Sequence, residues 1–312
     1  MNPLPPLAII TPNPALDRIL TTSQLRLGTV RRVAETHIAA GGKGLNVARA
    51  ARTLNLNTTI CAPLGGLTGQ QVAWLAAQEG LPLQAVAISG ETRVCTLVVD
   101  TVEGSVTVLN EIGPVLNAAE WHAFTQRIYN QSAQWNLICG SLPPGVPPEA
   151  LTELVSELRK QRKQVLVDSS GPALAAAVAA TPNVVKVNGD ELGELLGVTI
   201  DSIAAAQQAV ATLYRSGIAV AVVTLGTQGA VGIDERGGVI AIPPTIAAQN
   251  PIGCGDSFFA GLAAALYDSQ ALAEAMRLAS ACAAADAQTL APGQIESDTV
   301  MKLSEYVTLS YW

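Results

Sequence analysis

Short runs of apolar residues recur along the chain, and between them lie stretches in which apolar residues return every three or four positions. The runs predict buried strands, and the spaced stretches predict amphipathic helices. Strands are expected at 7–11, 59–63, 85–88, 137–139, 165–168, 184–187 and 219–224, and helices at 44–54, 70–78, 118–130, 149–161 and 203–214. Alternating strands and helices indicate βαβ units, so the sequence predicts an α/β fold with a mostly parallel sheet covered on both faces.

Two stretches, 24–39 and 92–112, alternate apolar and polar residues with no helix between the alternating parts. Each is typical of a hairpin that has one covered face, and Gly104 lies where the second would turn. Together they predict a small β-sheet beside the main one. The chain contains no Pro/Ser-rich linker, repeat or low-complexity tail, so residues 1–312 are expected to form a single domain.

The composition narrows the class of protein. Hydrophobic residues make up 49% and charged residues 14%, which is enough to bury a core and argues against disorder. The net charge of −7 and the lack of any Lys/Arg-rich run argue against a nucleic-acid partner. No apolar stretch approaches the roughly 18 residues of a membrane span, and the start lacks signal-peptide features. Five scattered cysteines without a CxxC pair favour reduced thiols in a cytoplasmic protein.

The segment 250–266, NPIGCGDSFFAGLAAAL, carries the most chemistry. Gly253 and Gly255 flank Cys254 and allow close backbone approach by a ligand. A helical pattern follows at once, and its free N–H groups and dipole would attract an anion. Asp256 could then take a proton from a hydroxyl beside a bound phosphate. Taken alone, the segment is equally compatible with a glycine turn and an aspartate that only caps the helix.

A second segment, AGGKGLNVA at 40–48, brackets Lys43 with glycines just before a helix. It does not have the spacing of a P-loop, and the simplest reading is a loop with a solvated lysine. The polar Asn46 on the otherwise apolar first turn of that helix is less easily explained in this way.

Two further segments follow apolar strands. In KVNGDE, Asn188 and Glu191 are three apart at the start of a helix, so they share a face and could hold waters around Mg²⁺. An acidic helix start favoured by the dipole would look the same. The segment TLGTQG at 224–229 is a glycine-bearing strand exit that could pass close to a nucleotide, or a simple turn.

Together these segments resemble the ribokinase-like carbohydrate kinases. The matching motifs run in order through nearly the whole chain as ITPNPALD, GGKGLNVARA, TRVCTLVVD, GSLPPG, KVNGDE, TLGTQG and NPIGCGDSFFAG. NPALD, the lysine of GGKG and the string NEIGP are similar to the hexose-phosphate kinase branch, which contains 1-phosphofructokinase, tagatose-6-phosphate kinase and the minor 6-phosphofructokinase. The resemblance implies a mostly parallel central sheet flanked by helices, with a small β-sheet lid formed by segments of about 13–40 and 92–113.

The resemblance also implies roles for individual residues. The base matches Asp256, and the anion hole for the transferred phosphoryl group matches Gly253, Cys254 and Gly255, with the amides of 253–256 as donors. Sugar-site positions match Asp17, Gly42, Lys43, Asn46, Arg93, Ser141 and Arg32, with Arg31 as an equal candidate for the last. Nucleotide and Mg²⁺ positions match Lys186, Asn188, Glu191, Thr224, Gly226 and Gly229. A monovalent cation such as K⁺ would contact the carbonyls of Asn250 and Ile252.

The expected reaction is ATP-dependent phosphorylation of fructose 1-phosphate, tagatose 6-phosphate or fructose 6-phosphate to the bisphosphate, with Mg²⁺ as cofactor. Alternatives are a kinase of an unphosphorylated sugar or nucleoside, and a catalytically silent sugar-phosphate sensor. Two cations, Lys43 and Arg93, favour a phosphorylated ligand. The intact Gly-x-Gly-Asp motif, with Asn188 and Glu191, favours an enzyme over a sensor.

A homodimer is expected to form through the lid, because a one-faced sheet needs a cover and exposed strand edges invite aggregation. Burial of Val94, Val99 or their neighbours against the second copy is expected, as is delivery of Arg31 or Arg32 to the neighbouring site.

Overall fold

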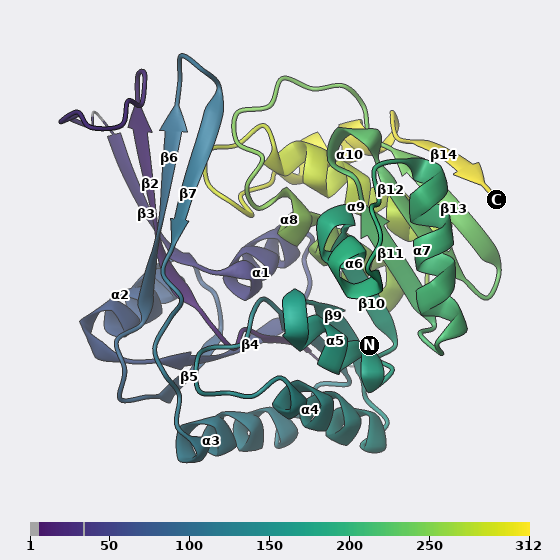
Figure 1. The fold of residues 1–312 in the computed structure, drawn as a ribbon, viewed down its shortest axis with the longest axis horizontal. Coiled ribbons are helices and arrows are strands. Elements are labelled where there is room, and N and C mark those ends of the chain that lie inside the picture. The colour runs from purple at the N-terminus through teal and green to yellow at the C-terminus, as the bar shows by residue number, and fades with distance from the viewer. Residues whose placement is uncertain (1–5, 34) are drawn as a thin grey trace.

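The computed structural model describes residues 6–33 and 35–312 (Figure 1). The large sheet contains β1 (Leu7–Ile10), β4 (Thr58–Leu64), β5 (Leu83–Ala87), β8 (Trp135–Cys139), β9 (Gln164–Asp168), β10 (Val184–Asn188), β11 (Val220–Thr224), β12 (Ala230–Asp234), β13 (Gly237–Ile242) and β14 (Thr308–Tyr311). Their order is β14-β13-β12-β11-β10-β9-β8-β1-β4-β5. The strands from β11 to β5 are parallel, whereas β12, β13 and β14 are added antiparallel at one edge. The seven strands predicted from apolar runs all belong to this sheet, so the predicted α/β class is confirmed.

Helices cover both faces of the large sheet (Figure 1). One face carries α1 (Lys43–Thr53), α2 (Gly66–Gln78), α8 (Cys254–Tyr267), α9 (Leu272–Asp286) and α10 (Ser297–Ser304). The other carries α3 (Ala118–Tyr129), α4 (Glu149–Lys160), α5 (Gly171–Ala179), α6 (Gly189–Leu196) and α7 (Ile203–Arg215). The five predicted helices are all present. Because the central strands are parallel, their carboxyl ends lie at one edge of the sheet, where loops can form a ligand site.

The most buried helix is α8, and its residues from 256 to 265 are all buried. Its small side chains let it approach α9 closely, since a Cβ at Gly261 would lie 2.9 Å from the Cα of Ala279. A helix that is apolar all round belongs in the core. The start of α8, at Cys254, is therefore held firmly at the sheet edge.

A separate small sheet has the order β3-β2-β6-β7 and stands beside the large one (Figure 1). Its strands are β2 (Ala15–Thr22), β3 (Glu35–Gly41), β6 (Arg93–Asp100) and β7 (Ser105–Asn110). The second predicted hairpin is confirmed: β6 and β7 are antiparallel, and Gly104 takes a positive φ of 65° in the turn between them.

The first predicted hairpin, at 24–39, is wrong. The strands of that hairpin are β2 and β3, and residues 24–33 form the loop that connects them. Leu27 and Val30 in this loop are 97% and 98% exposed. Leu25 and Leu27 alternate as strand residues do, but Leu27 lies in solvent. Alternation alone does not show whether a face is covered.

The inner face of the small sheet packs on the loops that precede α8 and follow α9. Leu97 and Val99 form an apolar cluster with Ala291, and Ile252 packs against it. The expectation that a second copy buries Val99 is therefore wrong, because the large part of the same chain already covers this side chain. The outer face carries the half-buried Val98 and the exposed Leu109.

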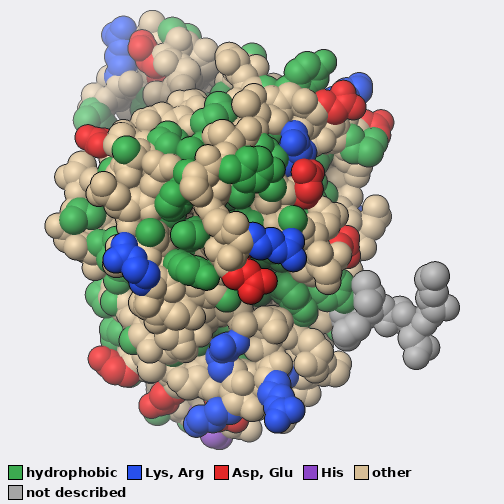
Figure 2. All heavy atoms as spheres, turned by 90° about the vertical axis from the view of Figure 1, so that its right-hand side faces the viewer, with side chains coloured by type: hydrophobic (Ala, Val, Ile, Leu, Met, Phe, Trp, Pro, Cys, Tyr) green, Lys and Arg blue, Asp and Glu red, His purple; other side chains and the backbone are tan. Residues whose placement is uncertain are grey.

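No helix in the described part of the chain has the length and apolar character needed to cross a membrane. On the face drawn in Figure 2, the Lys and Arg side chains lie scattered among hydrophobic and neutral ones.

Candidate active site

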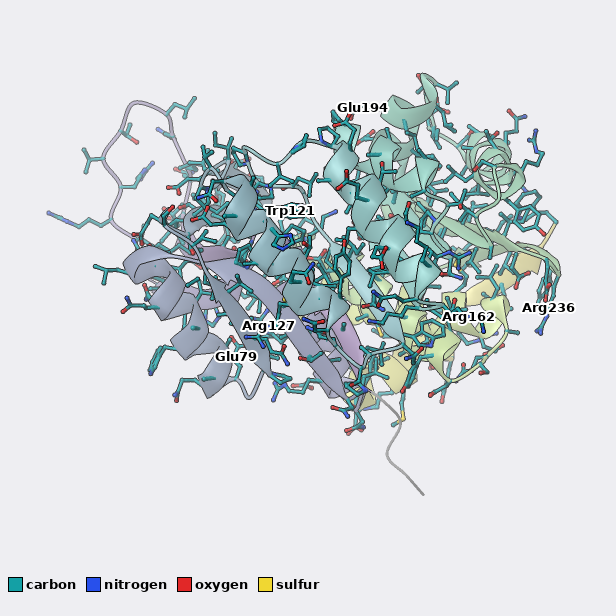
Figure 3. All side chains as sticks on the ribbon, turned by 90° about the horizontal axis from the view of Figure 1, so that it is seen from below. Glu79, Trp121, Arg127, Arg162, Glu194 and Arg236 are labelled. Atoms are coloured by element: carbon teal, nitrogen blue, oxygen red, sulfur yellow. The ribbon has the colours of Figure 1, made fainter. Side chains whose placement is uncertain are left out.

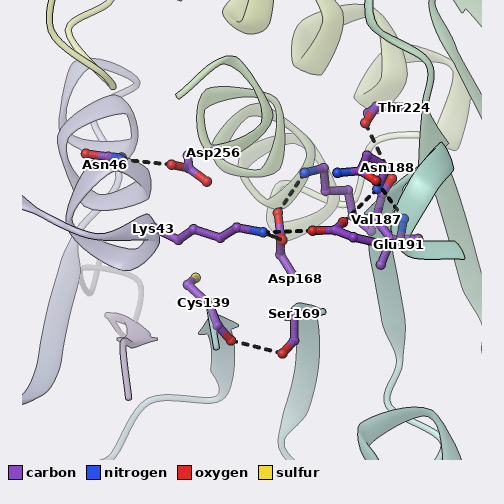
Figure 4. A network of polar contacts seen from close by, with 12 residues as sticks. Lys43, Asn46, Cys139, Asp168, Ser169, Val187, Asn188, Glu191, Thr224 and Asp256 are labelled. Carbon is purple, nitrogen blue, oxygen red and sulfur yellow. Dashed lines mark hydrogen bonds and ion pairs between the residues drawn. The ribbon is translucent and has the colours of Figure 1, made fainter. Parts of the chain in front are cut away.

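The sequence-predicted polar residues meet at the carboxyl edge of the large sheet (Figure 4). β9 ends at Asp168 and β10 ends at Asn188, while α1 begins at Lys43 and α8 begins at Cys254. Parallel strands bring their carboxyl ends to one edge, so residues far apart in sequence become neighbours there.

Asp256 lies on the first turn of α8 and is 7% exposed. The Asn46 side-chain amide donates to Asp256 Oδ2 at 2.9 Å. Burial raises the pKa of Asp256 to about 6, although Lys43 and the Asn46 hydrogen bond act to lower it. Such a carboxyl group is ionised at neutral pH yet basic enough to accept a proton, as a general base requires.

The loop before Asp256 offers free backbone donors. Gly253 precedes the helix with φ 96°, and a Cβ there would lie 2.5 Å from the Cβ of Pro292, so only glycine fits. The amides of Gly253, Cys254 and Gly255 form no hydrogen bond to another described residue. The Asp256 amide was expected to be a fourth free donor, but it donates to Gly253 O at 2.8 Å. Three amides, not four, can therefore face an anion.

Two lysines flank this loop and share one buried carboxylate. Lys43 Nζ lies 2.5 Å from Asp168 Oδ1 and 3.5 Å from Glu191 Oε1, and Lys186 Nζ lies 2.7 Å from Asp168 Oδ2. Burial of Asp168 opposes ionisation, but the two ammonium groups outweigh it and lower the pKa of Asp168. The Lys186 ammonium also sits 3.0 Å from where a Cβ of Gly255 would be. Positive charge is thus held beside the free amides.

Asn188 and Glu191 cap the start of α6. The Asn188 side chain accepts from the Glu191 amide at 2.8 Å, and Glu191 Oε2 accepts from the Asn188 amide at 2.9 Å. Glu191 Oε1 faces Lys43. The pair thus forms a reciprocal helix cap, which was not predicted from the sequence, and the remaining lone pairs of both side chains are available to water or a cation.

The residues predicted to bind the sugar lie where the small sheet meets α1. Asp17 is buried against Gly41, since a Cβ on that glycine would overlap its carboxylate. Burial raises the pKa of Asp17 to about 6, while Arg49 and the Gly42 amide lower it. Ser141 accepts a hydrogen bond from the Asn13 amide at 3.3 Å.

Arg93 borders an open hollow of about 450 Å³ near the base of the small sheet. Its guanidinium donates to the carbonyls of Asn13, Pro14 and Glu111 at 2.8, 3.4 and 2.9 Å. Three of five donors are used in this way, which leaves two for an anion.

Two predicted residues, Arg31 and Arg32, lie away from this centre, whereas Thr224 borders it as the strand partner of Asn188 (Figure 4). Arg31 and Arg32 are exposed in the loop between β2 and β3. The Thr224 hydroxyl, at the end of β11, donates to Val187 O at 3.4 Å. Gly226 and Gly229 follow with positive φ values of 56° and 104°, which a tight turn requires.

Three buried charged residues near the centre were not predicted, namely Arg49, Asp168 and Asp286. Asp168 ends the buried strand of sequence VLVD, and a carboxylate at the carboxyl end of a parallel strand is a signal of a site residue that the sequence offered. Asp286 Oδ2 has no hydrogen-bond partner among the described residues and lies 2.9 Å from where a Cβ of Gly253 would be. Arg49 gave no local signal, because its partners are far apart in sequence.

Comparison with known proteins agrees with this geometry. The model of the pfkB family of carbohydrate kinases matches residues 13–298. The chain is 36% identical over 278 residues to 1-phosphofructokinase of Rhodobacter capsulatus, which covers 88% of each protein. It is 33% identical over 304 residues to ATP-dependent 6-phosphofructokinase isozyme 2 of Escherichia coli strain K12, covering 96% of this chain and 98% of that one. This chain belongs to the pfkB family of carbohydrate kinases.

Solved structures show the same fold. Phosphofructokinase-2 of Escherichia coli in complex with substrates and products superimposes with a TM-score of 0.91 at 31% identity, covering 96% of this chain and 99% of that one. The same protein in complex with potassium also gives a TM-score of 0.91, at 30% identity. The ribokinase-like fold expected from the motifs is therefore confirmed.

Proposed function

We propose that this protein transfers the γ-phosphoryl group of ATP to a hydroxyl of a hexose phosphate. The observation that carries the proposal is the buried carboxyl of Asp256 beside three free amides at the start of α8. The similar proteins named 1-phosphofructokinase and 6-phosphofructokinase support a hexose phosphate as acceptor, as does a tagatose-6-phosphate kinase of Staphylococcus epidermidis that is 31% identical over 294 residues.

In this reaction Asp256 accepts the proton of the attacking hydroxyl, and the hydroxyl oxygen attacks the γ-phosphorus in line. The bond from the γ-phosphorus to the β,γ-bridging oxygen breaks, and ADP leaves with that oxygen. The amides of Gly253, Cys254 and Gly255 hold the transferred group, and only backbone donors are needed, so cysteine at 254 is compatible with activity. Lys186 lies above Gly255 and adds positive charge where negative charge develops. Lys43 pairs with Asp168 and Glu191, so it serves the phosphoryl side as well as the sugar side.

On the sugar side, Asp17, Gly42 and Asn46 line the position of the acceptor ring. Arg93 and Ser141 stand where the sugar phosphate binds, and Arg93 has donors left for it. On the nucleotide side, Thr224, Gly226 and Gly229 border the adenosine-binding loop after β11.

Magnesium fits the residues present. Asn188 and Glu191 offer amide and carboxylate oxygens, the donors that Mg²⁺ and its waters prefer, and each keeps lone pairs beyond the helix cap. When bound with ATP, the ion neutralises phosphate charge. The Asn188 and Glu191 side chains would orient the waters that the ion carries.

A monovalent cation fits beside the anion site. The carbonyls of Asn250 and Ile252 would contact it, and the potassium complex of the Escherichia coli relative supports the choice of ion. The unpartnered Asp286 Oδ2 next to Gly253 adds negative charge that a cation would balance.

The small sheet, formed by segments 13–40 and 92–113 of a single domain, acts as the lid. Its inner face packs on Ile252 and Ala291, so it can exclude water from the transfer. Its outer face, with Leu20, Val98 and Leu109, is the surface through which two copies form a homodimer. Arg32 or Arg31, on the exposed loop, would then reach the partner's sugar site. The five free cysteines support a cytoplasmic location.

The test is a coupled ADP-release assay with wild-type protein and Asp256→Asn across hexose phosphates, free sugars and nucleosides. Wild-type protein should turn over a hexose phosphate best. Asp256→Asn should lower kcat by about 10² to 10⁴ while ATP binding is kept. Near-normal turnover by the variant would show that Asp256 is not the base. A preference of wild-type protein for free ribose or fructose would show that the acceptor is not a hexose phosphate. If wild-type protein turned over no acceptor, a catalytically silent sensor would be the remaining function.

A further inference from the structure

Arg49 lies one helical turn after Asn46 on α1 and is 2% exposed. All five N–H groups of its guanidinium have acceptors. Nε and Nη2 donate to the Glu79 carboxylate, Nη2 donates to Ala40 O at 2.7 Å, and Nη1 donates to Pro292 O at 2.8 Å and to Asn46 Oδ1 at 3.1 Å. A planar group with every donor used has one orientation, so Arg49 is fixed in place.

Apart from Asn46 on α1 itself, these acceptors come from three different parts of the fold. Glu79 follows α2 (Figure 3), Ala40 lies near the end of β3 in the small sheet, and Pro292 lies in the segment after α9. Pro292 also packs against Gly253. The guanidinium thus joins the sugar side of the site to the anion loop, and α1 carries the connection.

The contact with Asn46 determines how its amide is turned. A guanidinium can only donate, and an ionised carboxylate can only accept. With the amide oxygen toward Arg49, the amide nitrogen donates to Asp256 Oδ2 at 2.9 Å. If the Asn46 amide were reversed, its nitrogen would point at the donors of Arg49 and its oxygen at the acceptor oxygen of Asp256.

We propose that Arg49 is a positioning residue for phosphoryl transfer, which acts through Asn46 to keep a hydrogen-bond donor on the Asp256 carboxylate. The inference rests on the proposed role of Asp256 as the base. It explains why a charged side chain is buried one turn after Asn46, on a helix whose other buried side chains are apolar, although burial of a charge is costly.

Loss of this donor raises the pKa of Asp256, because the Asn46 hydrogen bond favours the ionised form. The other charged groups that face Asp256 stay in place in such a variant; they are Lys43, Asp168, Lys186, Asp17 and Asp286. The loss of one hydrogen bond to a charged group is expected to raise the pKa of Asp256 by about one unit. The base is then protonated in a range where it is normally ionised.

The experiment measures kcat against pH at saturating ATP and hexose phosphate. The variant is Arg49→Gln combined with Glu79→Gln, so that no buried charge is left unpaired and the residue at 49 no longer dictates the Asn46 orientation. Its acid limb should move up by about one pH unit, with kcat recovering to within a few fold at high pH and the KM for ATP unchanged. Arg52→Gln, on the exposed side of the same helix, is the matched control and should follow wild-type protein.

An acid limb that stays in place, or a kcat lowered equally at every pH, would overturn the proposal. Should the double variant fail to fold, Asn46→Ala with Arg49 intact must show the same shift of the acid limb, and its absence would equally overturn it. Asp256→Asn distinguishes failure of the proposed function from failure of the proposed role of Arg49. Turnover by Asp256→Asn contradicts the proposed function. An inactive Asp256→Asn, together with an unshifted acid limb in the Arg49 variant, contradicts only the role of Arg49.

Discussion

At the scale of single residues, the carboxyl of Asp286 is the least satisfied charged group of the site. It is 1% exposed, Oδ1 accepts from the Gly293 amide at 2.8 Å, and Oδ2 has no partner among the described residues. Burial raises the pKa of Asp286 to about 7, although the hydrogen bond from the Gly293 amide acts to lower it. Between its unfolded value near 4 and about 7, the folded protein binds the extra proton, so stability falls as the pH rises through this window.

We therefore expect Asp286→Asn to be more stable than wild-type protein at pH 8, by the order of 2 kcal/mol, and to flatten the pH dependence of stability between pH 4 and 7. Urea unfolding at several pH values, without added monovalent cation, measures this. Asp268→Asn, at an exposed carboxylate after α8, is the control and should change neither quantity. Equal destabilisation of Asp286→Asn at every pH would show that the carboxylate itself is needed.

Arg93 provides a second residue-scale prediction. Removing a charge-assisted contact worth roughly 1.5–3 kcal/mol should raise the KM for the hexose phosphate by about one to two orders of magnitude in Arg93→Ala. The KM for ATP should stay nearly constant, because the guanidinium lies among the carbonyls of 13, 14 and 111, on the proposed sugar side. Arg159→Ala, exposed on α4, is the control. An unchanged KM for the hexose phosphate would place its phosphate elsewhere.

At the scale of elements, the sequence predicted most strands and helices because buried runs and 3.6-residue periods are local signals. The hairpin at 24–39 failed for a reason of the same kind. Leu25 and Leu27 are spaced like strand residues, but Leu27 lies in solvent. The true strand β2, which carries Asp17, begins with consecutive buried residues and so shows no clean alternation. The orientation of Asn46 and the shared position of Asp168 depend on contacts between distant segments, which a single sequence does not display.

The seal between the small sheet and the anion loop is an element-scale feature. Leu97 is 2% exposed and packs in the cluster that contains Ala291 and Ile252. Leu97→Ala should cost about 2–5 kcal/mol and loosen β6 and β7 relative to β10 and β11. Hydrogen exchange would show faster exchange in the small sheet alone, and ATP hydrolysis without sugar should rise as water enters. Uniformly faster exchange throughout the chain would mean that the cluster holds the whole fold and not only the lid.

At the scale of the whole molecule, the proposed dimer uses the outer face of the small sheet. Light scattering at micromolar concentration should report about twice the chain mass of 32.2 kDa. Leu109→Lys should give monomers with weaker hexose-phosphate binding, because Leu109 is 61% exposed on that face. Val198→Lys, at a residue that is 54% exposed after α6, is the control and should remain dimeric. A wild-type monomer with full activity would contradict the dimer.

The polarity of the large sheet has a practical consequence. All the proposed chemistry lies where the parallel strands end, so the turns that lead into those strands are remote from it. The turn between α4 and β9, where Arg162 is labelled in Figure 3, is one of these. Lys160 beside it is exposed, while burial raises the pKa of the native thiols of Cys61 and Cys254 to about 12. A single cysteine introduced as Lys160→Cys could therefore be alkylated selectively, which gives a site for a fluorophore or a surface tether that leaves catalysis undisturbed.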